Sequence, residues 1–245
     1  MTSTIVQLKN LNEQIAERLG REIVSGDTPE GGRLPVEAEL CERFGVSRPV
    51  IREVTKTLAS KGLIASKPRV GTVVRSRRYW NLLDPEVLDW LIQALPESRF
   101  LDMLFEVRMT IEPAAAALAS VNATEDDIAA IADAYRGMAA ARTPEELLEP
   151  DIRFHQAVMD ATHNELMSYI GNTLHAALAV SIRLTSRHPD TYDLSLPRHE
   201  AVYNAIAKRD AAAARAAVEN LLRESRKDFE VLAEAGVSSG AERTL

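Results

Sequence analysis

Near the start of the chain, apolar side chains recur every fourth residue, at Leu11, Ile15, Leu19 and Ile23. This spacing places them along one face of an amphipathic helix. A short second helix is expected from Pro35 and a third after the N-cap residue Ser47, with the turn FGVS between them. The segment 63–76 has β-branched residues on both sides of a Pro/Gly turn, which predicts a basic hairpin. Two helices, a tight turn and a hairpin describe a winged helix-turn-helix.

Beyond residue 78 the pattern becomes helical, and strand signals do not recur. Helical periodicity and helix-end signals predict seven helices, at about 84–95, 97–120, 124–141, 144–161, 164–187, 191–208 and 210–234. The expected fold is therefore mainly α, an amino-terminal winged helix-turn-helix followed by an all-α helical bundle. The expected divisions are a winged domain over 1–78, a linker with a connecting helix over 79–96, a helical domain over 97–235 and a flexible tail over 236–245.

Charge is unevenly divided between these two regions. Residues 1–78 carry 14 Lys and Arg against 9 Asp and Glu, whereas residues 79–245 carry 15 against 27. The net charges of +5 and −12 mean that only the amino-terminal region attracts a polyanion. A basic small domain joined to an acidic larger one is typical of a nucleic-acid-binding protein with a second function. Chance clustering is the alternative that charge alone leaves open.

Composition narrows the class of protein further. With 46% hydrophobic and 27% charged residues among 245, the chain can bury a sizeable core. A single cysteine, Cys41, excludes an internal disulfide framework and a four-cysteine zinc site. We find no apolar run long enough to span a membrane and no basic-then-apolar leader. We therefore expect a cytoplasmic protein without a membrane partner.

The third predicted helix carries three cations on one face, because Arg48, Arg52 and Lys56 are spaced by four. The planar fork of arginine can donate two hydrogen bonds to one guanine, which discriminates between bases by ~1–3 kcal/mol. A lysine at the same surface only anchors the phosphate backbone. Taken alone, three such cations are also typical of an ordinary solvated helix face.

The segment LPVEAELCERFGVSRPVIREVTKTLASKGLIASKPRVGTVV resembles the DNA-binding domain of the GntR family of bacterial transcription regulators. The resemblance implies that the third helix enters the major groove and that the wing tip reaches the minor groove. It gives base reading to Arg48 and Arg52, and further DNA contacts to Ser47, Lys56, Arg69 and Gly71. Some relatives have arginine in the place of Ala38, so the operator sequence cannot be carried over from them.

In the second region, Asp151 and His155 are four apart on a predicted helix, so both side chains point the same way, as two ligands of one metal must. A hydrogen-bonded couple has the same spacing. With His199 in HxxxxxAIxxxD, the pattern is similar to the effector-binding FCD domain of the FadR subfamily, over roughly 97–232. The resemblance implies a divalent metal held by these three residues. The family's fourth ligand, a histidine, would stand at Leu221.

That departure leaves two interpretations of the site. Three protein ligands would leave the metal open positions for water or an acidic effector, with zinc expected first and nickel or manganese as alternatives. Without a metal, the same side chains would form a polar pocket floor that binds the effector by hydrogen bonds.

Three other residues are candidates for effector binding. Arg108 stands where relatives place an arginine that grips an effector carboxylate, and a forked, permanently charged donor suits that task. Its alternative role is a salt bridge with Glu112, four residues later. Ser195 is a candidate for bonding a hydroxyl, and Arg183, with Arg187 beside it, for a further anion contact. Ordinary surface positions are the alternative for these.

The chain as a whole is most similar to the galactonate-responsive repressors of the FadR subfamily. The resemblance implies a homodimer on palindromic operator DNA, released when a small carboxylic or sugar acid binds the helical domain. We expect no enzymatic activity. The alternatives are a metal-dependent hydrolase acting through Asp151, His155 and His199, and a constitutive DNA-binding dimer without an effector.

Overall fold

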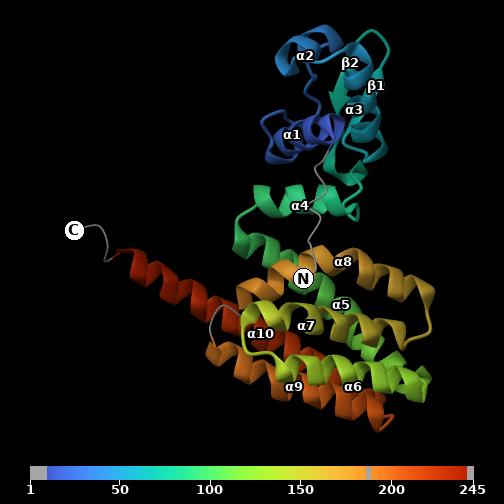
Figure 1. The fold of residues 1–245 in the computed structure, drawn as a ribbon, viewed down its shortest axis with the longest axis vertical. Helices are drawn as coiled ribbons and strands as arrows, with labels where there is room; N and C mark the ends of the chain where they lie inside the picture. Colours follow the sequence, from blue (N-terminus) through green and yellow to red (C-terminus); the bar gives the residue numbers. More distant parts are fainter. Residues whose placement is uncertain (1–9, 186–188, 242–245) are drawn as a thin grey trace, which may run out of the picture. The chain divides into compact units, whose positions relative to one another are not determined.

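The computed structural model describes residues 10–185 and 189–241, with only the backbone for some residues of α8, the start of α9 and residues 232–241. The chain divides into two compact units between Glu97 and Ser98 (Figure 1). Each unit has its own core. The described elements confirm the expected mainly α fold with an amino-terminal winged helix-turn-helix.

The amino-terminal unit contains four α-helices and one hairpin in its described part. These are α1 (Leu11–Ser25), α2 (Glu37–Phe44), α3 (Arg48–Ser60), β1 (Ile64–Lys67), β2 (Gly71–Val74) and α4 (Pro85–Ala94), with a short 3-10 turn, η1 (Arg77–Tyr79), before α4. The strands are antiparallel, with Ile64 opposite Val74 and Lys67 opposite Gly71. Helices α2 and α3, with the turn between them, are the predicted helix-turn-helix, and the β1–β2 hairpin is the predicted wing.

Local chemistry explains where these helices begin and end. Asn10 and Glu13 form a capping box that satisfies free backbone N–H groups at the start of α1. Gly26 and Gly45 follow α1 and α2 in the left-handed conformation that favours glycine. Asp84 caps α4 by accepting hydrogen bonds from the backbone N–H groups of its first turn.

Helix α4 belongs to the core of the amino-terminal unit. Trp90 of α4 is buried together with Ile15 and Leu19 of α1 and Leu58 of α3. At the end of α3, the ammonium group of the buried Lys61 lies 2.8 and 2.7 Å from the two carboxylate oxygens of Asp84. The connecting helix is thus fastened both to α1 and to the end of α3.

The carboxyl-terminal unit is helical throughout its described part. It consists of α5 (Glu97–Asn122), α6 (Glu125–Ala140), α7 (Pro144–Asp160), α8 (Glu165–Thr185), α9 (Pro189–Ala207) and α10 (Ala211–Ala241). Helix α10 continues past its predicted end at residue 234 and through the start of the segment expected to be a tail. The expectation of fraying rests on the usual poor order of the last residues of a chain, but extending an established helix costs far less than starting one.

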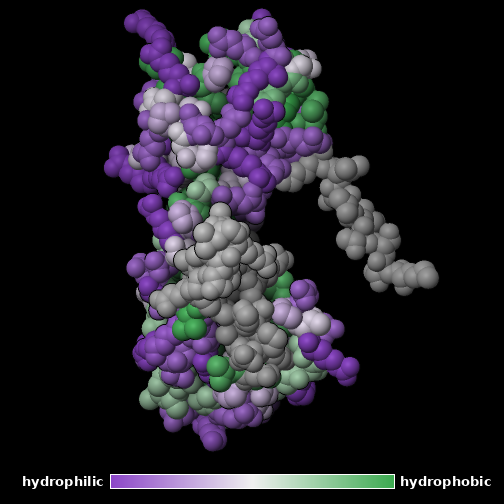
Figure 2. Space-filling view, turned by 90° about the vertical axis from the view of Figure 1, so that its left-hand side faces the viewer, coloured by the Kyte–Doolittle hydropathy of each residue, from purple (hydrophilic) through white to green (hydrophobic). Residues whose placement is uncertain are grey.

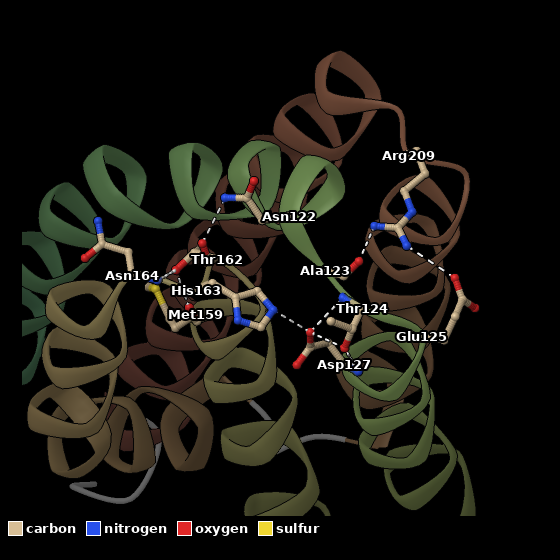
Figure 3. Close-up of polar contacts among 10 residues, drawn as sticks. All are labelled: Asn122, Ala123, Thr124, Glu125, Asp127, Met159, Thr162, His163, Asn164 and Arg209. Atoms are coloured by element: carbon tan, nitrogen blue, oxygen red, sulfur yellow. Dashed lines mark hydrogen bonds and ion pairs between the residues drawn. The ribbon is translucent and has the colours of Figure 1, made fainter.

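The loops that follow α5, α7 and α9 lie together at one end of this unit, where polar contacts link them (Figure 3). The joining contacts are Asn122 to the Thr162 carbonyl at 2.9 Å, His163 to Asp127 at 2.8 Å, and Arg209 to the Ala123 carbonyl. They tie together the carboxyl ends of α5, α7 and α9. Since these helices carry the buried polar cluster described below, the contacts fix one end of the frame that holds it.

The described surface is mainly hydrophilic on the face drawn in Figure 2, and hydrophobic residues show there only in separate patches. Apolar side chains of both units gather instead in their interiors. Among the described residues, no helix is both long and apolar enough to cross a membrane.

The close approach of α1 and α4 depends on Gly20, because a Cβ atom there would lie 2.2 Å from Cζ3 of Trp90. We expect Gly20→Ala to lower the free energy of unfolding by about 1–2 kcal/mol. Overpacking costs ~1–3 kcal/mol, whereas the better helix propensity of alanine returns only ~1 kcal/mol. Urea denaturation followed by tryptophan fluorescence measures this, since both tryptophans lie in the amino-terminal unit.

The matched control is the same substitution in a Trp90→Leu background, where the smaller side chain removes the clash. There Gly20→Ala should be neutral or stabilising. A stabilising effect of Gly20→Ala in the natural sequence would contradict the packing argument.

Candidate functional site

The outer face of α3 presents the three cations that the sequence singled out. Arg48, Arg52 and Lys56 are exposed, whereas Ile51, Val54 and Leu58 of the same helix are buried. Helix α3 is thus held to the core by its apolar side and offers its cationic side to solvent. Such a helix suits the major groove of duplex DNA in size and in charge.

An acidic residue that the sequence reasoning missed lies beside these arginines. Glu37, at the start of α2, accepts a hydrogen bond from Nε of Arg52 at 3.0 Å and lies 3.9 Å from Nε of Arg48. Lys56 instead pairs with Glu53 of its own helix at 2.8 Å. Exposed ion pairs contribute little to stability. The contact of Glu37 therefore matters mainly for orienting the Arg52 guanidinium group.

The remaining candidate DNA contacts lie at the start of α3 and at the wing tip. Ser47 is exposed and stands at the N-cap of α3, but its side chain makes no capping hydrogen bond. Arg69 and Gly71 both have positive φ, 62° and 99°, so the wing turns sharply at its tip. No atom lies within 4 Å of a Cβ placed on Gly71, which leaves its backbone open to a close neighbour.

A second polar cluster is buried inside the helical unit. The structure brings together Asp151 and His155 of α7 with His199 of α9. Oδ1 of Asp151 lies 3.3 Å from Nε2 of His155 and 3.9 Å from Nε2 of His199. One ligand atom from each of the three residues lies within 4.8 Å of the others. The set of one carboxylate oxygen and two imidazole nitrogens is typical of transition-metal sites.

The hydrogen bonds of His199 fix its ring nitrogens in different roles. Nδ1 donates to the backbone carbonyl of Ser195 at 2.9 Å. In the neutral ring Nε2 is then unprotonated, and its lone pair is free to accept a hydrogen bond or bind a metal. That Nε2 and Oδ1 of Asp151 are both buried and without a hydrogen-bond partner. Buried polar atoms are rarely left unsatisfied, so two of them in one place call for a shared partner. Both accept rather than donate, and a cation would satisfy both.

Two residues of α5 complete the cluster. Nδ1 of His155 lies 3.0 Å from Oε2 of Glu112, and Nε of Arg108 lies 2.5 Å from Oε1 of the same carboxylate. The Arg108 guanidinium also lies 3.2 Å from Nε2 of His155. The two roles considered for Arg108, a salt bridge with Glu112 and a place beside the site, therefore coexist. Glu112 itself was foreseen only as a partner of Arg108.

Electrostatics sets the charge of each carboxylate in the cluster. Burial alone raises the pKa of Glu112, but the positive charge of Arg108 outweighs it and holds that pKa well below its ordinary value. The pKa of Asp151 is likewise lowered despite burial, because the imidazole of His155 lies 3.3 Å from its carboxylate. Both side chains are therefore carboxylates at neutral pH.

The imidazoles of His155 and His199 differ in pKa, and therefore in charge at neutral pH. Burial lowers the pKa of His199 to about 4 and outweighs the opposing charge of Asp151, so this ring is neutral at pH 7. Burial also lowers the pKa of His155, but the negative charge of Glu112 outweighs it and the pKa rises to about 9. A metal at this position would have to displace a proton from His155, which makes metal affinity dependent on pH.

The space beside the cluster is small. A cavity of about 20 Å³ is lined by Arg108, Glu112 and His155 together with apolar side chains such as Leu178. A second cavity, of about 10 Å³, is lined in part by Leu221. These volumes match a water molecule or an ion and fall far short of a six-carbon acid.

The other predicted site residues have different outcomes. Leu221 is buried on α10 and cannot ligate a metal, in agreement with the missing fourth ligand. The hydroxyl of Ser195 lies 3.2 Å from Nδ1 of His199, so this residue borders the cluster. Arg183 belongs to α8, but its side chain lies outside the described part of the chain, and so does Arg187 as a whole.

A cationic winged helix joined to a helical domain with a buried carboxylate and imidazole cluster defines a class, that of ligand-responsive DNA-binding proteins. The chain belongs to the gntR family of bacterial regulatory proteins. Residues 11–74 match that family and residues 103–224 match the FCD domain.

Curated relatives agree with this assignment. The galactonate operon transcriptional repressor of Escherichia coli (strain K12) is 36% identical over 88% of this chain and 95% of its own length. The HTH-type transcriptional regulator LutR of Bacillus subtilis (strain 168) is 30% identical over 80% of this chain and 90% of its own length.

Among solved structures, the Listeria monocytogenes protein Lar, which controls expression of the agr system, matches 92% of this chain and 99% of its own. The TM-score is 0.61 at 17% sequence identity, a likeness of fold alone. The family and these relatives identify a DNA-binding transcriptional regulator rather than an enzyme. The alternative of a metal-dependent hydrolase is therefore set aside.

The buried pair of Arg108 and Glu112 generates a stability prediction. Glu112→Gln leaves the Arg108 charge buried without its carboxylate, so we expect the free energy of unfolding to fall by about 3–5 kcal/mol. The control is Asp133→Asn, which removes the partner of Arg136 from an exposed ion pair and should cost less than ~1 kcal/mol. Chemical denaturation at pH 7 measures both, and equal losses would contradict the argument.

The same pair has a pH dependence of known sign. A carboxyl whose pKa is lower in the folded state contributes stability above its ordinary pKa, 4.5 for Glu112, and loses it as the pH falls toward the folded value. The advantage of the natural sequence over Glu112→Gln should therefore shrink below pH 4.5. An advantage that stays constant down to pH 3 would contradict the charge assignment.

Proposed function

We propose that this protein is a repressor that a small carboxylic acid releases from operator DNA, with a sugar acid such as galactonate as the first candidate. The acid would bind beside a divalent metal in the helical unit. The observation that carries the proposal is the pair of buried acceptor atoms, Oδ1 of Asp151 and Nε2 of His199, that share one space and lack a partner. The name of the Escherichia coli relative supports the choice of sugar acid.

Asp151, His155 and His199 would hold the metal. Leu221 supplies no fourth ligand, so open coordination positions remain for water or an oxygen of the effector. Nitrogen and oxygen ligands suit zinc first, with nickel or manganese as alternatives. Glu112 would orient His155 as the Ser195 carbonyl orients His199, since each accepts a hydrogen bond from Nδ1 and turns Nε2 toward Asp151.

Charge balance supports an acid as the effector. With neutral imidazoles, the carboxylates of Glu112 and Asp151 and the guanidinium of Arg108 sum to −1. A divalent cation would change this to +1, which a monocarboxylate would neutralise. Arg108 lies beside His155, where its forked donor can bind a carboxylate. Ser195 is proposed to bind a hydroxyl of the acid, and Arg183 to add a further anion contact.

Size supports a link between effector binding and a change of conformation. The cavity of about 20 Å³ beside Arg108 has no room for a sugar acid, so side chains around it must move for the acid to enter. An acid that binds only the opened conformation favours that conformation. If the opened conformation binds DNA less well, the acid weakens DNA binding by the same coupling, typically ~1–3 kcal/mol.

At the DNA, the proposal gives base reading to Arg48 and Arg52 and phosphate contacts to Ser47 and Lys56. Arg69 at the wing tip would enter the minor groove, with Gly71 allowing close approach. A homodimer would place two α3 helices on the halves of a palindromic operator in the bacterial cytoplasm.

The DNA interface is tested by comparing Arg52→Ala with Lys56→Ala on a fragment from upstream of the protein's own gene and on random DNA. Arg52→Ala should weaken operator binding by ~1–3 kcal/mol more than binding to random DNA, because only the operator offers the matched base. Lys56→Ala should weaken both equally and reduce the slope of affinity against salt concentration by about one. Equal losses on both DNAs for Arg52→Ala would refute base reading.

The metal site is tested by elemental analysis of purified protein. His155→Ala combined with His199→Ala should abolish the bound metal, because only Asp151 of the proposed ligand set remains. His163→Ala is the control, since His163 pairs with Asp127 outside the cluster. Undiminished metal in the double variant would show that these ligands are wrong.

The effector is tested by titrating sugar acids and dicarboxylates, with and without added zinc, into the protein bound to its upstream DNA. Release by an acid in the natural protein, and weaker release in the double histidine variant, is the expected result. If no acid changes the affinity, the protein is a constitutive DNA-binding dimer and the proposal fails.

A further inference from the structure

The wing is wider than the β1–β2 hairpin labelled in Figure 1, because a third segment pairs with the free edge of β2. The backbone of residues 31–34 shares hydrogen bonds of 2.9 to 3.0 Å with that of residues 72–74. Arg33 thereby lies opposite Val73 in an antiparallel bridge. We call the two strands and this segment the wing sheet. It contains a cation that the sequence pattern of the hairpin does not include.

The wing sheet has two different faces. One face packs on the core of the amino-terminal unit through Leu34, Ile64 and Val74. Side chains alternate along a strand, so Arg33 and Val73 point to the other side, which we call the outer wing face. Arg33 is exposed there, whereas Val73 is only 4% exposed. The aliphatic stem of a long cationic side chain can cover such an apolar neighbour and leave its charged end in water.

Two further cations belong to the outer wing face by register. Arg75 stands two residues beyond Val73, and Lys67 pairs with Gly71 near the tip. The guanidinium carbon of Arg75 lies 4.6 Å from the centre of the Tyr79 ring, a cation–π contact. This contact restricts the Arg75 side chain, which lowers the entropy that it would lose on binding a ligand.

The outer wing face has no carboxylate to neutralise its cations. Asp and Glu are absent from residues 54–83, which contain seven Lys and Arg. In the part of the chain that the structure describes, Arg33, Lys67 and Arg75 form no ion pair, in contrast with the pair of Arg52 and Glu37 on the neighbouring helices. Exposed cations without counterions attract a polyanion.

The dimensions of the wing place Arg33 level with the phosphate backbone when the tip enters a minor groove. Residue 73 lies two strand positions beyond Gly71, a distance of roughly 7 Å. The minor groove is ~7.5 Å deep, so its floor meets the tip and its phosphate rim lies near residue 73. Arg33 is paired with that residue at the edge of the sheet and would face those phosphates.

Arg75 is the diagonal neighbour of Arg33 across the wing sheet, at roughly 7–8 Å between Cα atoms. Successive phosphates of one DNA strand follow at ~3.4 Å along the helix axis. The two guanidinium groups are therefore far enough apart to bind different phosphates of the same strand. Each forked donor suits a phosphate oxygen pair.

We propose that the outer wing face binds the phosphate backbone of duplex DNA through Arg33 and Arg75. This contact is separate from the helix α3 that reads bases and from the wing tip. The inference rests on the DNA interface of the proposed function and adds a surface to it. Phosphates are alike at every base pair, so this surface contributes affinity and fixes the position of the wing without reading sequence.

The proposal is tested by measuring the affinity of the full-length protein for its upstream DNA and for random DNA over a range of salt concentrations. Arg33→Ala and Arg75→Ala should each weaken both affinities equally, by roughly fivefold per bound copy at 0.1 M salt. Each should lower the slope of log affinity against log salt by about 0.9 per bound copy, because one phosphate contact is lost. Arg21→Ala is the control, since it removes the same charge from an exposed pair with Glu17 on α1 and should leave both affinities unchanged.

A lysine substitution separates charge from packing. A phosphate requires a charge at this position rather than a particular base-reading fork, so Arg33→Lys should keep the salt slope and most of the affinity. An unchanged slope in both alanine variants, an equal loss in Arg21→Ala, or an equal loss in Arg33→Lys and Arg33→Ala would each overturn the proposal. Thermal melts followed by circular dichroism verify that each variant folds. The comparison of operator with random DNA for Arg52→Ala tests base reading separately.

Discussion

The helical unit is organised around the need to neutralise two buried carboxylates, Glu112 and Asp151. An unpaired charge in a protein interior costs several kcal/mol, so a fold that buries two must surround them with donors. Arg108 lies against one of them, and the ring of His155 stands between the two, 3.0 Å from one and 3.3 Å from the other. Helices α5 and α7 are held in register by this chain of contacts.

The third helix of the site contributes by a different route. His199 of α9 is neutral and held by the Ser195 carbonyl, so it offers a lone pair and no charge. Each of the three helices also has a proline within two residues of a site side chain, namely Pro113, Pro150 and Pro197. A proline removes one helical hydrogen bond and bends the helix. The helical hydrogen-bond pattern is therefore interrupted next to the site in all three helices.

In the amino-terminal unit, one core joins the elements that would bind DNA to helix α4. Gly20 admits Trp90 against α1, and Lys61 fastens the end of α3 to Asp84. A displacement of α4 therefore displaces α3 as well. The chain leaves this core only after α4, where Leu95 is extended because the following Pro96 disfavours a helical residue before it.

The sequence by itself determined the elements and their inward faces. The four-residue spacing in α1, the glycines after α1 and α2, and the four-residue spacing of Asp151 and His155 are local patterns, and a helix expresses them directly. The sequence also showed that position 221 supplies no fourth ligand, because a leucine cannot coordinate a metal wherever the fold places it.

Only the tertiary structure decided which distant side chains meet. Nothing in the local pattern showed that Glu112 would contact His155, that Glu37 would orient Arg52, or that the Ser195 carbonyl would choose the tautomer of His199. Sequence periodicity defines a face of a helix, but the partner of that face depends on how whole helices pack. How the helices pack depends on the combined volume and charge of residues far apart in the chain. The spacing of residues within one helix therefore does not predict its packing partner.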